Sequence, residues 1–550
     1  MSSFLALVCL VAILGAAPNS CNGEVAMTPP LGWNSWNFFA CPGLNEDVVM
    51  KAAQAMVDTG LAKAGYKYIN LDNCWAEPKR DGNGNIVPKA STFPNWQAMI
   101  DKIHSMGLKF GLYTDFGLGT CGDKEPGSYQ HEEQDAKTYA AWKVDYVKDD
   151  DCRAPAGQLS PPSYKAMSEA LNATGRPMVF SVKQSQPIGT AREVCNMRRV
   201  THDIKATFYD MMREVEVNHR DGLAAYAGPG YWNDMDMLEV GNGNLTDVEE
   251  LTHMAFWCLL KSPIILGNDL GNMSPRTLAI VSNANALAVN QDALGRQGVR
   301  ISAGNSGVTV AIAILGNCTA SSKETTSSSQ TWSLEPTATS GAPRGTDCVR
   351  VRNAALDTCL SGHGAKAGEF PTPTQPVTGA CNYSDANQLW SYDQDTMQLR
   401  HLVSELCLTI DKPTIPKYKL ILAPCTHSHK LPLQQFAFDE GVRFRSKFAD
   451  YAAHPLCLDV DVHEDLQAWA APLSPDPNSK KERWAAVLFS RVLASSRNVT
   501  LRFSDLSPVT SSSLHVYDVW TGRSLGVFTG SYSEVIPAHG SSFIMLVASD

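Results

Sequence analysis

Three consecutive aspartates stand between Lys148 and Cys152 in the stretch DYVKDDDC, residues 145–152. Side chains alternate in direction along a strand, so Lys148 and Asp150 are expected on one side of this strand and Asp149 on the other. A lysine beside a carboxylate favours the ionised form of that carboxylate. An ionised and positioned carboxylate is what the nucleophile of a glycosidase requires, which makes Asp150 the candidate nucleophile.

Glycosidase chemistry also needs a second carboxyl group, protonated near the working pH, on the other side of the sugar. Candidates at the ends of other predicted strands are Asp72, Asp203 and Asp236. A metal site at the aspartate run is disfavoured, because consecutive strand residues cannot all face one ion and the spaced calcium-loop pattern is absent. The histidines, including His202 beside Asp203, show no ligand spacing, so we expect no metal.

Short apolar runs alternate with helical stretches from about residue 28 to residue 295, and this alternation predicts a parallel sheet covered by helices. In one helical stretch, residues 45–65, Val48, Ala52 and Met56 recur at helical spacing and Gly60 marks the end. Eight strand candidates predict a (β/α)8 TIM barrel. A doubly wound open sheet is the alternative, although its usual Gly-rich phosphate turn is not visible. The candidates are residues 31–36, 66–75, 109–115, 144–150, 178–182, 198–204, 231–238 and 262–270.

A polar or aromatic residue stands near the end of most of these strands. In a barrel, the carboxyl ends of the strands converge on one face, where active sites are built. Aspartate is also a frequent helix cap, which explains one or two such positions but not the whole set. The positions are Trp36, Asp72, Asp115, Asp150, Asp203, Asp236 and Asp269.

The composition of the 550-residue chain is that of a globular protein with several domains, at 44% hydrophobic and 19% charged residues. Its net charge of −10 argues against a nucleic-acid binder. An apolar run from Phe4 to Ala17 predicts a signal peptide over residues 1–23, and no later stretch predicts a membrane span. Secretion would suit the 15 cysteines. Possible glycosylation triplets begin at Asn172, Asn244, Asn317, Asn382 and Asn498.

After about residue 300 the sequence becomes rich in predicted strands and carries a weak internal repeat. DTCLSG (357–362) precedes CNYSDANQLW (381–390), and ELCLTI (405–410) precedes CTHSHKLPLQQF (425–436). The repeat resembles the ricin-type β-trefoil lectin domain, here permuted and inserted over residues 303–465. We expect Cys359–Cys381 and Cys407–Cys425 bridges, a Cys318–Cys457 bridge between the two halves, and Gln-x-Trp tryptophans in the trefoil core. Glycan binding by this domain is a separate hypothesis.

The last segment, residues 466–550, has alternating apolar runs that predict a small antiparallel β-sandwich. Residues 298–302 are a possible first strand of it, with the trefoil inserted afterwards.

Several motifs stand in collinear order over about residues 28–300: LGWNSWNFFAC, DNCW, GLYTDFG, VKDDDC, WNDMDML and KSPIILGNDL. In them the chain resembles the secreted α-galactosidases of glycoside hydrolase family 27. The resemblance implies a retaining, metal-independent glycosidase domain at residues 24–297 that needs no cofactor. It assigns Asp150 as nucleophile and Asp203 as acid/base. It also implies Cys41–Cys74 and Cys121–Cys152 disulfides, and sugar contacts from Trp36, Asp72, Asn73, Tyr113, Lys148, Arg199 and Asp236.

Departures from the family pattern leave the preferred sugar open. Asn73 replaces the second residue of an Asp-Asp pair, and Lys183-Gln184-Ser185 stands where relatives have Cys-Glu-Trp. That change could leave Cys195 without its disulfide partner, and Arg198 replaces a tryptophan.

We expect hydrolysis of terminal α-galactosides, with the charge of Asp150 raising the pKa of Asp203. An α-N-acetylgalactosaminidase, a β-L-arabinopyranosidase and a carbohydrate-binding protein with weak turnover are the alternatives. Extracellular, lysosomal and vacuolar locations all remain open, as does the oligomeric state.

Overall fold

The computed structural model describes residues 25–122, 125–157, 160–304, 466–491 and 496–549, together with separate strands and short stretches between 311 and 462. The signal peptide predicted for residues 1–23 lies outside these residues. The chain forms two compact units. One includes the chain up to Ser302 with Ala468–Phe489 and Asn498–Asp550, and the other includes Ala303–Gln467 and Ser490–Arg497.

An eight-stranded parallel sheet forms the centre of the first unit, in the order β7-β6-β5-β4-β3-β2-β1-β8. A parallel bridge between Leu238, just after β7, and Leu266 in β8 closes the sheet into a barrel. The TIM barrel is therefore confirmed and the open doubly wound sheet is wrong. The strands are β1 (Leu31–Asn34), β2 (Tyr68–Asn70), β3 (Lys109–Asp115), β4 (Tyr146–Asp150), β5 (Val179–Val182), β6 (Met197–Arg199), β7 (Trp232–Asp234) and β8 (Ile264–Leu266).

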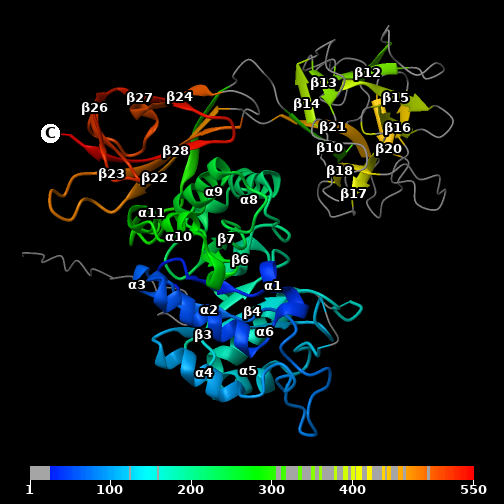
Figure 1. The fold of residues 1–550 in the computed structure, drawn as a ribbon, viewed down its shortest axis with the longest axis vertical. Helices are drawn as coiled ribbons and strands as arrows, with labels where there is room; N and C mark the ends of the chain where they lie inside the picture. Colours follow the sequence, from blue (N-terminus) through cyan, green and yellow to red (C-terminus); the bar gives the residue numbers. More distant parts are fainter. Residues whose placement is uncertain are drawn as a thin grey trace, which may run out of the picture. The chain divides into compact units, whose positions relative to one another are not determined.

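Helices follow the strands and surround the sheet (Figure 1). The second helix shows how the sequence sets its bounds. Asn45 caps it by accepting a hydrogen bond from the Val48 amide, and the chain turns at Gly60, where φ is +85°. The helices are α1 (Trp36–Gly43), α2 (Glu46–Asp58), α3 (Leu61–Ala64), α4 (Trp96–Ser105), α5 (Glu132–Ala141), α6 (Ser160–Ala173), α7 (Ile188–Val194), α8 (Phe208–Arg220), α9 (Asp247–Leu259), α10 (Pro275–Val281) and α11 (Ala284–Asn290).

A β-sandwich completes the first unit. Its apolar residues merge with the barrel core, since Phe256 of α9 packs against Trp469 and Phe489, with ring centroids 5.5 and 5.3 Å away. The six-stranded sheet has the order β26 (Ser524–Thr529), β25 (Ser513–Asp518), β28 (Ser541–Ala548), β23 (Arg483–Ser490), β22 (Leu466–Leu473) and β9 (Val299–Gly304). The two-stranded sheet contains β24 (Arg497–Arg502) and β27 (Ser531–Ile536).

The second unit is built of antiparallel strands. Its first and last long strands, β10 (Ala311–Asn317) and β21 (Leu456–Val462), pair along their whole length. Between them lie β11 (Trp332–Pro336), β12 (Cys348–Asn353), β13 (Thr358–Ser361), β14 (Val377–Ala380), β15 (Trp390–Asp393), β16 (Gln398–His401), β17 (Cys407–Asp411), β18 (Tyr418–Ala423), β19 (Phe436–Asp439) and β20 (Arg443–Ser446).

Trp390, the tryptophan of a Gln-x-Trp motif, is fully buried in this unit and its Nε1 donates to the Leu360 carbonyl at 2.9 Å. It is therefore a core residue, as expected. Cys359 and Cys407 are disulfide-bonded. Their predicted partners Cys381 and Cys425 lie outside the described residues, and so does Cys318.

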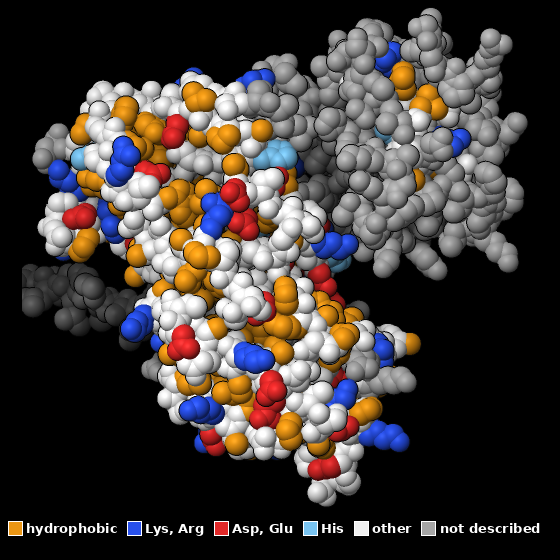
Figure 2. Space-filling model, in the orientation of Figure 1, with side chains coloured by type: hydrophobic (Ala, Val, Ile, Leu, Met, Phe, Trp, Pro, Cys, Tyr) orange, Lys and Arg blue, Asp and Glu red, His pale blue; other side chains and the backbone are white. Residues whose placement is uncertain are grey.

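On the face drawn in Figure 2, lysine and arginine side chains are interspersed with aspartate and glutamate rather than gathered. Among the described helices, none combines the length and apolar character that crossing a bilayer requires.

Candidate active site

A cleft of about 820 Å³ opens at the carboxyl ends of the barrel strands. Every residue predicted to act on or bind the sugar lines it: Trp36, Asp72, Asn73, Tyr113, Lys148, Asp150, Arg199, Asp203 and Asp236. Two further strand-end aspartates lie elsewhere in structural roles. Asp115 accepts hydrogen bonds from the Gly117 and Cys152 amides, and Asp269 caps a short 3-10 helix by accepting from the Gly271 amide. For Asp269, the helix-cap interpretation is the right one.

Lys148 lies in β4 on the same side as Asp150, but its closest partner is a different carboxylate. Its Nζ lies 2.7 Å from Asp72 Oδ2, and it sits 5.4 Å from the centroid of the Tyr113 ring. Burial by itself would lower the pKa of Lys148, but the carboxylates of Asp72 and Asp150 raise it well above its usual value. The direct ion-pair partner of Asp150 is instead Lys183, whose Nζ lies 3.7 Å from Asp150 Oδ1.

Asp72 is held from several directions. Its Oδ2 also accepts a hydrogen bond from Asn34 Nδ2 at 2.9 Å, and its Oδ1 accepts one from the Asn73 amide at 2.9 Å. The Asp72 side chain is only 4% exposed. This side of the cleft is therefore fixed before any sugar enters.

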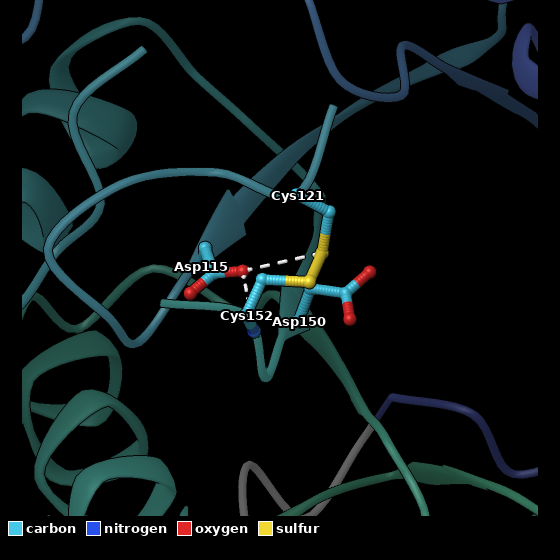
Figure 3. A group of neighbouring side chains, drawn as sticks. All are labelled: Asp115, Cys121, Asp150 and Cys152. Atoms are coloured by element: carbon cyan, nitrogen blue, oxygen red, sulfur yellow. Dashed lines mark hydrogen bonds between the residues drawn. A yellow bond between two sulfur atoms is a disulfide. The ribbon is translucent and has the colours of Figure 1, made fainter. Parts of the chain in front are cut away.

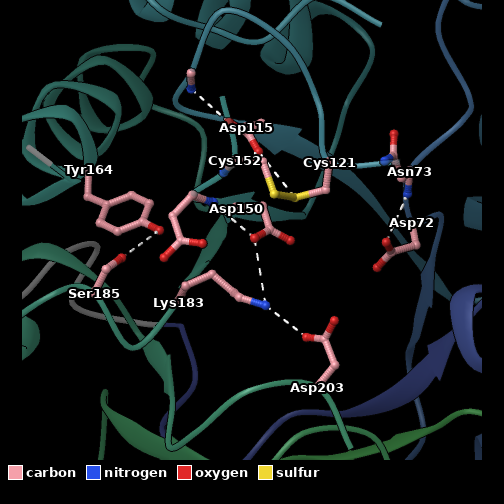
Figure 4. Close-up of a disulfide and its surroundings, with 12 residues drawn as sticks. Asp72, Asn73, Asp115, Cys121, Asp150, Cys152, Tyr164, Lys183, Ser185 and Asp203 are labelled. Carbon is pink, nitrogen blue, oxygen red and sulfur yellow. Dashed lines mark hydrogen bonds and ion pairs between the residues drawn. A yellow bond between two sulfur atoms is a disulfide. The ribbon is translucent and has the colours of Figure 1, made fainter. Parts of the chain in front are cut away.

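Asp203 projects into the cleft, and its side chain is 68% exposed. Lys183 Nζ lies 2.8 Å from Asp203 Oδ1 (Figure 4). Arg199 Nη2 lies 3.2 Å from the same oxygen, and Arg199 also pairs with Asp236 at 2.6 Å. Partial desolvation by itself would raise the pKa of Asp203, but Arg199 and Lys183 hold it well below its usual range. In the free protein the two cations thus outweigh any raising effect of Asp150, and the pKa of Asp203 lies below its usual range rather than above it.

The separation of Asp150 and Asp203 is bounded by Lys183, which contacts the Oδ1 atoms of both at 3.7 and 2.8 Å. These two oxygens lie no further apart than the sum of the two distances. This upper limit on the separation equals the smallest value typical of inverting glycosidases, whose range is roughly 6.5–9.5 Å. The roughly 5–5.5 Å typical of retaining glycosidases lies within the limit.

The two acidic neighbours of Asp150 differ in their surroundings. Asp149 points away from the cleft and is fully buried, and neither carboxylate oxygen has a hydrogen-bond partner among the described residues. Burial and the charges of Asp115 and Asp150 raise the pKa of Asp149 well above its usual value. Burial and Asp150 also raise the pKa of Asp151, whose amide donates to Asp150 Oδ1 at 2.9 Å. Burial and the neighbouring carboxylates therefore favour the protonated form of Asp149, beside the candidate nucleophile.

Both disulfides expected at the barrel rim are present, Cys41–Cys74 and Cys121–Cys152. Potential ligand atoms of Asp115, Cys121, Asp150 and Cys152 lie within 4.8 Å of one another (Figure 3). The two sulfurs are bonded to each other, so they are not the thiolates that bind metals. Burial raises the pKa of Asp115 to about 8.

The loop after β5 is held without a disulfide. Cys195 is buried and is not disulfide-bonded, as its missing strand-five partner suggested. Arg198 instead donates to the carbonyls of Gln186 at 2.5 Å, Gln184 at 2.8 Å and Arg199 at 3.1 Å. Arg198, which departs from the family pattern, therefore holds the loop after β5, which also departs from that pattern.

Two polar contacts of the cleft were not predicted. Asn34 follows Trp33 in a short apolar run, and only its position in a strand facing Asp72 could have indicated a role. Lys183 stood out as a departure from the family pattern, but no local pattern predicts its contact with Asp203. That contact depends on β5 and β6 lying side by side, with Val182 opposite Arg198.

Family models match three segments of the chain. They are described as alpha galactosidase A (residues 28–292), ricin-type beta-trefoil lectin domain (347–484) and alpha galactosidase C-terminal beta sandwich domain (463–546). An alpha-galactosidase of Oryza sativa subsp. japonica is 46% identical over 282 residues, which are 50% of this chain and 67% of the relative. One from Cyamopsis tetragonoloba is 47% identical over 285 residues, 51% of this chain and 68% of the relative.

An alpha-N-acetylgalactosaminidase of Gallus gallus is 36% identical over 298 residues, 50% of this chain and 73% of the relative. Among solved structures, alpha-galactosidase I from Mortierella vinacea matches with a TM-score of 0.60 and 24% identity, covering 96% of this chain and 99% of that one. The structural match supports the fold, and the sequence matches carry the assignment. By these matches, and with the expected strand-end residues gathered in one cleft, the chain belongs to the alpha-galactosidase family.

Proposed function

We propose that this protein hydrolyses terminal α-galactosides with retention of configuration, with Asp150 as nucleophile and Asp203 as acid/base. The activity itself follows from family membership. The observation that carries the residue roles is Lys183, which contacts both carboxylates and so bounds their separation.

The reaction has two displacements. In the first, an Asp150 oxygen bonds to the anomeric carbon, the bond to the leaving oxygen breaks, and the Asp203 proton passes to that oxygen. In the second, Asp203 takes a proton from water, the water oxygen bonds to the anomeric carbon, and the bond to Asp150 breaks. Asp203 ends the cycle protonated again.

The other cleft residues hold the sugar. Trp36 supplies an apolar wall for the pyranose ring, and Asp72 and Asn73 contact the 4- and 6-hydroxyls. Lys148 reaches the 3-hydroxyl and Arg199 the 2-hydroxyl. Support for this arrangement comes from the shared cleft and from the Lys148–Asp72 and Arg199–Asp236 ion pairs, which fix these groups before binding.

The decisive experiment measures hydrolysis of methyl α-galactoside, whose alkoxide leaving group requires the acid, by Asp150→Ala and Asp203→Asn. We expect each to lose at least about 10³-fold in kcat/KM. Asp269→Asn, a strand-end aspartate outside the cleft, is the matched control. NMR of the first-formed sugar should show the α anomer. Wild-type-like turnover in either variant, or β-galactose as first product, would refute the assignment.

The sugar preference is tested with a panel of aryl glycosides. The match to an alpha-N-acetylgalactosaminidase and the altered β5 loop make the α-N-acetylgalactosaminide the main competitor, with the β-L-arabinopyranoside next. We expect the α-galactoside to have the highest kcat/KM. Faster cleavage of either competitor would reassign the substrate, and hydrolysis of none with retained glycan binding would favour a carbohydrate-binding protein.

The ricin-type lectin match supports glycan binding by the inserted domain as a second function. A glycan array with the full chain carrying Asp150→Ala tests it, because a chain without the proposed nucleophile should not hydrolyse the glycans on the array. We also propose a location in the secretory pathway or outside the cell, since stable disulfides are typical of oxidising compartments. The domain limits proposed are residues 24–297, 303–465 and 466–550, with 298–302 joining the sandwich.

A further inference from the structure

Lys183 lines the cleft in contact with both candidate catalytic carboxylates. It follows β5 directly, its side chain is 10% exposed, and its Nζ lies between the two candidate catalytic carboxylates. Figure 4 shows the amine directed to Asp150 on one side and Asp203 on the other. The contact with Asp203 is the shorter, at 2.8 Å against 3.7 Å.

Charged groups face this ammonium and Asp203 from every neighbouring strand end. β4 contributes Lys148, Asp150 and Asp151, and the end of β6 contributes Arg199 and His202. Asp236 follows β7 and pairs with Arg199. Because Arg199 is shared with Asp236, Lys183 is the cation whose closest carboxylate is Asp203 itself.

We propose that Lys183 is a positioning residue that holds Asp203 ionised and fixed toward Asp150, and thereby favours the second displacement at the expense of the first. This inference rests on the proposed acid/base role of Asp203. Lys183 exchanges no proton with substrate and forms no bond to it in either step.

The two steps need opposite states of Asp203. Bond cleavage in the first step requires its protonated form, which an ammonium at 2.8 Å disfavours. Once Asp150 is esterified, it carries no charge. Lys183 then pairs with Asp203 alone and favours its ionised form, which can accept a proton from water. The lowered pKa of Asp203 in the free protein agrees with this division.

The expected consequence concerns the leaving group. A nitrophenolate departs with little protonation, whereas a sugar or alkoxide leaving group requires the acid. We therefore expect the wild-type protein to discriminate strongly by leaving-group pKa and to act on sugar leaving groups mainly at acidic pH.

The test compares Lys183→Met with Lys183→Arg, which keeps the charge, and with Lys205→Met, which removes an exposed charge from the same cleft. For each, kcat/KM is measured across aryl α-galactosides of increasing phenol pKa and as a function of pH. For Lys183→Met we expect the basic limb of the pH profile to move to higher pH by about one unit. At pH values above the wild-type limb, the ratio of kcat/KM for the poorest leaving group to kcat/KM for the best one should be about tenfold higher in Lys183→Met than in wild type.

Lys183→Arg and Lys205→Met should keep the wild-type limb and leaving-group slope. An unchanged limb and slope in Lys183→Met, with a change in KM alone, would overturn the proposal and make Lys183 a simple substrate contact. A shift of equal size in Lys205→Met would also overturn it, because any cleft charge would then suffice.

A second measurement needs no turnover. Infrared difference spectra against Asp203→Asn report the carbonyl band of protonated Asp203, which should appear at higher pH in Lys183→Met than in wild type. The same onset in both proteins would overturn the proposal. If instead the wild type cleaves no α-galactoside, the proposed function fails, while the infrared titration still decides the Lys183–Asp203 coupling.

Discussion

The two sides of the cleft are held together by different means. On the β1–β4 side, two disulfides join the segments after successive strands, and a buried ion pair links Lys148 to Asp72. On the β5–β6 side, Cys195 lies outside any disulfide and its Sγ donates to the Ala191 carbonyl, while Arg198 holds the loop through backbone carbonyls. The ion pair there joins Lys183 to Asp203, which is largely exposed.

The first side is therefore suited to binding the sugar, and the second side is suited to changing the protonation state of Asp203. The buried Lys148–Asp72 pair, beside two disulfides, presents fixed partners for sugar hydroxyls, whereas the exposed carboxylate of Asp203 beside Lys183 can still gain and lose a proton. Most departures from the family pattern, Lys183, Gln184 and Arg198 among them, lie on the second side, and Asn73 is the departure noted above on the first. We expect substrate preference and pH behaviour to have diverged there.

Lys148→Met should have the largest effect, and it tests whether the ion pair holds the first side of the cleft. Removing one partner of a buried pair leaves Asp72 charged and 4% exposed, so we expect a loss of about 3–5 kcal/mol in the free energy of unfolding. Urea unfolding measures it, with Lys137→Met as control because the Lys137–Glu133 pair on α5 is exposed. A loss no larger than that of the control would mean that the first side is not held by its ion pair.

Removing the Cys121–Cys152 disulfide should have the next largest effect. The double variant Cys121→Ser/Cys152→Ser frees the segment that follows Asp150, and we expect a loss of about 2–4 kcal/mol. Cys195→Ala, which removes a buried thiol outside any disulfide, should cost about 1 kcal/mol. Equal losses in the two variants would remove the distinction between a covalently tied side and an untied one.

Arg198→Met probes the second side. It removes hydrogen bonds to the carbonyls of Gln184 and Gln186, and we expect a loss of about 1–3 kcal/mol in the free energy of unfolding together with faster amide exchange over residues 183–186. Arg192→Met breaks a similar bond from α7 to the Pro229 carbonyl and should leave that exchange unchanged. Unaltered exchange in Arg198→Met would show that the loop is fastened by something else.

Asp149→Asn tests a single carboxyl group, on the outer face of the strand that carries Asp150. The raised pKa of Asp149 means that its contribution to stability is complete below the unfolded-state pKa and declines as the pH rises toward the folded-state pKa. Relative to wild type, Asp149→Asn should therefore gain about 1.4 kcal/mol per pH unit above roughly pH 4. Unfolding at pH 5, 6 and 7 measures the slope, and Asp58→Asn, at the exposed last residue of α2, controls for the loss of one carboxylate. Parallel curves for Asp149→Asn and wild type would show that Asp149 is not held neutral.

The barrel and the residues of its cleft could be predicted from sequence because both depend on local patterns. Apolar runs ending in Asp72, Asp150 and Asp236 place those side chains at one face once the strands are parallel. The pairing of Lys148 with Asp72, and of Lys183 with Asp203, could not be predicted, since each joins the ends of two different strands and depends on how the barrel brings those ends together. The direction of the Asp203 pKa was missed for the same reason, because it is set by cations from two other positions rather than by Asp150.

The adjacency of β9 and β22 has a consequence for how this architecture can change. The chain leaves the six-stranded sheet at the end of β9 and returns to it at the start of β22, on neighbouring strands. In topological terms the whole segment between β9 and β22 occupies the place of one loop between neighbouring strands. Loop-closure entropy grows only with the logarithm of loop length, by about 0.6 kcal/mol for each doubling. A module at this position can therefore be gained, lost or exchanged in evolution with little effect on the sandwich and barrel that carry it.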